Sequence, residues 1–226
     1  MEERASKAEL MRALGRLVRG LSALFWGLPL TLVITVKTAT TDWLRPLGML
    51  PAFLATALLF YGIMQLGYFQ REERVWRRAL ERAQFTSLIN VGLSPFIFWW
   101  NRLPHIPYFT LGVALLVLTS LIFLFNLNHL LQRLAAMLPD ETLRVETRHF
   151  TGMNLYLICA LVALFTLYIL AQQLPTLPPL VIDLLQALEM SRDWLLIMLV
   201  LLPVAMTMSL IWKIKEVIIG SILASE

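Results

Sequence analysis

The sequence predicts an all-α fold, a polytopic membrane protein built as a bundle of six transmembrane helices. Of its 226 residues, 58% are hydrophobic, and the mean hydropathy is +0.72, whereas a soluble domain is nearer about 45–50% apolar. A run of about 20 apolar residues spans the hydrocarbon core of a bilayer. Six runs of about this length hold no Asp, Glu, Lys or Arg, and they cover residues 21–36, 47–69, 85–100, 109–131, 152–170 and 194–212.

The basic residues predict how these helices are oriented. If alternate connecting segments lie on opposite sides, all but four of the 19 Lys and Arg residues share the side of the N-terminus; the exceptions are Lys37, Arg45, Arg102 and Arg192. Segments rich in Lys and Arg stay in the cytoplasm, so we expect a multi-pass inner-membrane protein with both termini cytoplasmic. Because the bases are spread over several segments, anionic lipid headgroups are the expected counter-charge, and no nucleic-acid partner is expected.

The first 20 residues also predict a helix. Leu10, Leu14 and Leu17 recur at helical spacing, and Arg12 and Arg16 share the polar side. This pattern is typical of an amphipathic helix that lies on a membrane surface; the alternative is a plain extension of the first transmembrane helix. The expected domains are therefore a cytoplasmic amphipathic helix (1–20), a transmembrane domain (21–212) and a short cytoplasmic tail (213–226).

Residues 70–84 predict a charged cytoplasmic helix that continues into the second or third transmembrane helix. The segment has neither Gly nor Pro and is rich in good helix formers. Such a helix is suited to a soluble protein partner at the cytoplasmic face, and the candidate contacts are Arg74, Trp76, Arg77 and Arg78. The alternative is a solvated helix whose long side chains reach into water.

The third run carries the most informative polar pattern. Ser87, Asn90, Ser94 and Asn101 follow one another at steps of three, four and seven residues, which places them on one stripe of a helix. Pro95 beside them predicts a kink, because proline has no N–H for the carbonyl four residues earlier. The stripe either lines a path for a polar or amphiphilic molecule or supplies hydrogen bonds between helices; we favour the second interpretation.

Two further patterns concern the arrangement of the chain. Phe85-Thr86 with Asn90 recurs as Phe150-Thr151 with Asn154, which suggests three repeated helical hairpins. Leucine and isoleucine in residues 180–190 predict a short interfacial helix on the outer side.

The sequence indicates no catalytic centre, cofactor or metal site. It has no HExxH, CxxC or glycine-rich phosphate loop, and the single cysteine, Cys159, leaves no partner for an intrachain disulfide. The least favoured hypothesis is an interfacial lipid-modifying enzyme that uses His149, Glu146 and Asp140.

In its layout alone, the chain resembles the six-span permease subunits of export-type ATP-driven transporters. Residues 1–20, 70–84 and 180–190 stand where those subunits carry an amphipathic, a cytoplasmic and an outer helix, and the resemblance implies a role in transport. From the residues themselves we expect a non-enzymatic inner-membrane protein, a structural or assembly subunit of a larger complex. The alternative is a permease or channel subunit for a neutral or amphiphilic solute.

Overall fold

In the computed structural model, the protein is described at residues 2–69, 73–103, 105–138, 141–173 and 192–223, and these residues contain no strand. The all-α prediction is therefore confirmed. The elements in chain order are α1 (Glu2–Thr40), the short 3₁₀ helix η1 (Arg45–Leu47), α2 (Leu50–Leu66), α3 (Arg74–Leu93), α4 (Pro95–Arg102), α5 (Pro107–Met137), α6 (Glu141–Gln173) and α8 (Arg192–Leu223).

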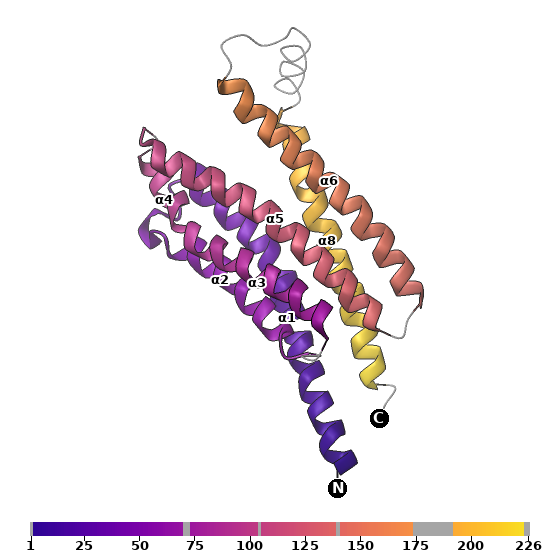
Figure 1. The fold of residues 1–226 in the computed structure, drawn as a ribbon. Helices are drawn as coiled ribbons and strands as arrows, with labels where there is room; N and C mark the ends of the chain where they lie inside the picture. Colours follow the sequence, from indigo (N-terminus) through magenta and orange to yellow (C-terminus); the bar gives the residue numbers. More distant parts are fainter. Residues whose placement is uncertain (1, 70–72, 104, 139–140, 174–191, 224–226) are drawn as a thin grey trace.

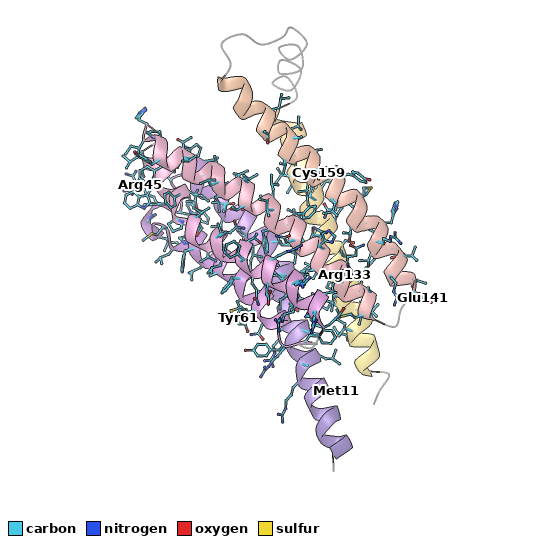
Figure 2. All side chains as sticks on the ribbon, in the orientation of Figure 1. Met11, Arg45, Tyr61, Arg133, Glu141 and Cys159 are labelled. Carbon is cyan, nitrogen blue, oxygen red and sulfur yellow. The ribbon has the colours of Figure 1, made fainter. Side chains whose placement is uncertain are left out.

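The helices form one elongated bundle in which α5 is central (Figure 1). α5 contacts α3, α4, α6 and α8, while α1 packs against α2 and also touches α4 and α8. The two chain termini lie towards the same end of the bundle, which is also where α5 ends and α6 begins. Figure 2 shows Met11 and Arg45 at opposite ends of the molecule.

The structure shows α1 as a single helix of 39 residues that passes through residue 20 without a break. Residues 2–20 are therefore helical and continuous with the first apolar run, and their place at a membrane surface stays a prediction. α8 likewise continues through residue 213 to Leu223. The expected domain limits at residues 20 and 213 therefore fall inside helices. The expected helix at 180–190 lies outside the described residues.

Small residues bring α1 and α2 close together. A Cβ atom added to Gly20 would lie 2.8 Å from the carbonyl oxygen of Gly62, and one added to Gly62 would lie 2.9 Å from Cγ of Leu24. Thr31 crosses the same contact, where its Oγ1 donates to the carbonyl of Ala55 at 3.0 Å. Close approach through glycine with hydrogen bonding between helices is typical of packing in membranes.

The outside of the bundle carries large apolar side chains. Among them, Tyr156 is 80% exposed, Trp26 68% and Phe85 65%. Within the described residues, two helical stretches are long and apolar enough to cross a membrane, Met11–Thr40 and Pro107–Met137. α2 is apolar but has only 17 residues. The six-span bundle and the ancestral hairpin repeat stay predictions.

Candidate functional site

The third apolar run is divided at the proline, as predicted. α3 ends at Leu93 and α4 begins at Pro95, since Pro95 offers no N–H to the carbonyl of Val91. The hydroxyl of Ser94 donates to that carbonyl at 2.9 Å. Ser94 therefore replaces the missing backbone donor at the break.

The polar stripe is split by this break into two environments. Ser87, Asn90 and Ser94 are 2%, 5% and 0% exposed, and the side-chain oxygen of Asn90 has no hydrogen-bond partner. Asn101 on α4 is exposed, and its amide donates to the carbonyl of Thr38 on α1 at 3.0 Å. The first three residues thus belong to the interior, and Asn101 joins α4 to the end of α1.

Asn101 also lines a small surface pocket between α1 and α4. Its walls include Thr38, Asp42, Arg45 and Arg102, and its interior volume of about 10 Å³ is the space that one water molecule needs. Ser87, Asn90 and Ser94 are not among its lining residues. This pocket therefore does not form a path along the stripe.

The basic surface at the start of α3 consists of Arg74, Arg77 and Arg78, all exposed. Arg77 forms an ion pair with Glu81, one helical turn further on, at 3.2 Å. Trp76 is different, because only 1% of it is exposed and its indole N–H donates to the carbonyl of Phe69 at 3.0 Å. We therefore correct the expected role of Trp76: it holds α3 against the end of α2 and offers no surface to a partner.

A buried polar network joins α5, α6 and α8. The amide nitrogen of Asn154 on α6 donates to Oδ1 of Asn128 on α5 at 3.0 Å and to Oγ1 of Thr207 on α8 at 2.9 Å. The amide nitrogen of Asn128 reaches the same Thr207 oxygen at 3.0 Å. All three residues are at most 1% exposed, so the network ties three helices together away from solvent.

Pro203 on α8 is part of this network through its carbonyl oxygen. That oxygen accepts from the Thr207 hydroxyl at 2.7 Å and from the Asn154 amide at 3.2 Å. The amide nitrogen of Asn154 therefore faces only hydrogen-bond acceptors. These contacts assign the nitrogen and the oxygen of the side-chain amide to their two positions. Its own oxygen is left buried without a partner, as are the hydroxyls of Thr147 and Thr151 on the same helix.

Sequence reasoning singled out Asn154 for its place in the repeat but missed Asn128 and Thr207. α5 is apolar around most of its circumference, so the spacing of its hydrophobic residues does not show which face is buried. A usable indication was present in α8, where Thr207 follows Pro203 by four residues. A hydroxyl at that spacing bonds back to the carbonyl one turn earlier.

The residues of the least favoured enzyme hypothesis are not gathered into a centre. His149 is exposed on α6, Glu146 pairs with Lys213 of α8, and Asp140 lies outside the described residues. Among the side chains that the structure describes, no group of three His, Cys, Asp or Glu is placed to hold a metal ion.

Fold and site together define a class: an all-α protein with a buried polar network between three helices and two helical stretches able to cross a membrane. No family model matches the chain, and comparison with curated proteins and with solved structures finds no match either. The layout resemblance to export-type permease subunits therefore has no similar structure behind it.

Proposed function

We propose that this protein is a multi-pass inner-membrane protein of six spans with both termini in the cytoplasm, and that it acts as a non-enzymatic structural or assembly subunit. The observation that carries the proposal is a bundle with an apolar exterior and three exposed arginines at the start of α3. The first feature suits lipid as the solvent, and the second suits an acidic surface of a partner protein.

The apolar exterior supports the membrane part of the proposal. Monomeric soluble proteins rarely expose continuous apolar surface beyond a few hundred square ångströms, yet large apolar side chains face outward on α1, α2, α5 and α6. The shared end of the two termini in Figure 1 agrees with an even number of crossings. The arginines of α3, the basic residues in the first 20 residues of α1, and Lys213 and Lys215 near the end of α8 then lie on the side that the charge bias assigns to the cytoplasm.

The exposed start of α3 supports the partner part. Of the three arginines, Arg77 is the one that forms an ion pair with a carboxylate of the described residues. Val75 between them is 49% exposed. Guanidinium groups beside an apolar side chain are well suited to bidentate contacts with carboxylates of a partner.

Cysteine accessibility tests the membrane topology. In a Cys159→Ser background, single cysteines replace Arg78 on α3 and Tyr108, which is 77% exposed at the start of α5. A membrane-impermeant maleimide applied to intact cells is expected to label position 108 and to reach position 78 only after permeabilisation. Labelling of both positions from one side would contradict the proposed topology.

Charge reversal tests the partner surface. Arg74→Glu, Arg77→Glu and Arg78→Glu together are expected to remove a protein cross-linked at this surface in native membranes. The matched control reverses Arg133 and Arg148, which are exposed on α5 and α6, and should keep the partner. A wild-type protein that cross-links only to itself would overturn the subunit role.

The unpartnered oxygen of buried Asn90 favours a permease or channel for a neutral solute as the second candidate. Proteoliposome swelling in a panel of small neutral solutes tests it. Asn90→Leu should abolish a flux that the wild-type protein supports, and a flux that this variant leaves unchanged excludes the stripe as the path.

A further inference from the structure

The face of α6 that carries Thr147, Thr151 and Asn154 holds three buried oxygen atoms without hydrogen-bond partners. Each of these residues is only 1% exposed. Their spacing of four and three residues places them along one side of the helix. A buried polar oxygen without a partner is costly, so this line of three points to a ligand.

The two threonines differ from most of the threonines that the structure describes. In nine of these the hydroxyl bonds back to the carbonyl four residues earlier, at 2.7 to 2.9 Å; they are Thr35, Thr38, Thr40, Thr41, Thr56, Thr86, Thr119, Thr166 and Thr207. Thr147 and Thr151 make no such bond although they are buried. Their hydroxyls are therefore free to bind something else.

We propose that this face of α6 is a water-binding site in which two ordered water molecules connect Thr147, Thr151 and Asn154. On one face of a helix, residues three or four apart have Cβ atoms about 5–6 Å from each other. One water that makes two hydrogen bonds of about 2.8 Å bridges oxygens up to about 5.6 Å apart. The spacing therefore suits one water in each interval.

The chemistry of the three oxygens selects water among small ligands. The Asn154 oxygen only accepts hydrogen bonds, while each threonine hydroxyl accepts and donates, so the ligand must do both. The oxygens are all neutral, and divalent cations in proteins favour carboxylate ligands.

Solvent reaches the end of the site that lies at Thr147. The neighbouring residue Glu146 has a side chain that is 52% exposed, and its ion-pair partner Lys213 is 39% exposed. At the other end of the site, the amide nitrogen of Asn154 is hydrogen-bonded to Asn128 and Thr207, and these bonds separate the proposed waters from the rest of the bundle interior.

Threonine-to-valine substitution tests the site through the sign of its effect. Valine has the shape of threonine but no hydroxyl. If water is bound, Thr147→Val and Thr151→Val each remove a water ligand, and the melting temperature of the full-length protein in detergent falls by several degrees. If no water is bound, the same substitutions remove a buried hydroxyl that has no hydrogen-bond partner, which should stabilise the protein. A rise in melting temperature would therefore overturn the proposal.

Two further variants and one direct observation complete the experiment. Thr151→Ser keeps the hydroxyl and should restore most of the stability that valine loses. Thr86→Val is the matched control, because its hydroxyl already bonds within α3 at 2.9 Å, and it should shift the melting temperature less. An experimental density map at about 2 Å resolution should show both waters. Density for a threonine hydroxyl turned back to its own helix, or a melting temperature that responds to sodium but not to choline, would overturn the assignment to water.

Discussion

The side-chain amide of Asn154 on α6 donates a 3.0 Å hydrogen bond to the side-chain oxygen of Asn128 on α5, and both residues are 1% exposed. Thr207 on α8 accepts from both amides. Polar side chains are expensive to leave unpaired in an apolar interior. This pair therefore specifies how α6 and α8 dock on α5, where leucines alone would allow the helices to slide past one another.

Asn154→Leu should destabilise the bundle. The change removes the bonds to Asn128, Pro203 and Thr207 and leaves their buried polar atoms with fewer partners. We expect a loss of about 2 kcal/mol in the free energy of unfolding, measured by denaturation with dodecyl sulfate in mixed micelles. In a double-mutant cycle with Asn128→Leu, the coupling should be about 1 kcal/mol. Asn126→Leu, on the half-buried side of α5, is the control, and an equal loss there would contradict a specific role for the network.

Gly20→Ala should weaken the contact between α1 and α2. A methyl group at Gly20 would lie 2.8 Å from the carbonyl oxygen of Gly62, so the two helices must move apart, at a cost of about 1–3 kcal/mol in the free energy of unfolding. Gly15→Ala on the same helix is the matched control, because nothing lies within 4 Å of the added Cβ. The control should raise helix stability by up to about 1 kcal/mol, so the two alanines are expected to act with opposite signs.

Trp76→Phe should destabilise the protein without affecting a partner that binds the α3 arginines. It removes the donor to the Phe69 carbonyl from a side chain that is 1% exposed, and the expected loss is about 1–2 kcal/mol in the free energy of unfolding. The control Trp26→Phe changes a residue that is 68% exposed and should stay within about 0.5 kcal/mol. Loss of a partner on Trp76→Phe in a protein of unchanged stability would return Trp76 to the contact surface.

Ser94→Ala should cost more than the same change at Ser22. Both hydroxyls donate to a carbonyl of their own helix, Ser94 to Val91 at 2.9 Å and Ser22 to Val18 at 2.8 Å. The Val91 carbonyl lacks a backbone donor because residue 95 is proline, whereas Ser22 itself offers its N–H to Val18. We expect a loss of about 1–2 kcal/mol for Ser94→Ala and less than about 0.5 kcal/mol for Ser22→Ala. Equal losses would show that Ser94 does not repair the break.

Local rules predicted the features that depend on neighbours in sequence. The break at Pro95 follows from the proline ring, and the helix that begins at Arg74 follows from a segment of helix formers without Gly or Pro. Trp76 was misplaced because a tryptophan among arginines looks exposed until the end of α2 is known to pack against it. Ser87, Asn90 and Ser94 are buried, but among the described residues the hydrogen bond from the stripe to another helix is made by Asn101. Both interpretations of the stripe therefore stay predictions.

By itself, the sequence determined an all-α chain whose apolar segments alternate with charged ones, because helix propensity and hydrophobic content are properties of short stretches. Only the tertiary structure decided which polar residues meet. Asn128, Asn154 and Thr207 are up to 79 residues apart, and their meeting depends on how α6 and α8 dock on α5. Helices that are apolar on nearly every side give no periodic signal for that docking, so the partners of each buried amide emerge only when the three helices are in place.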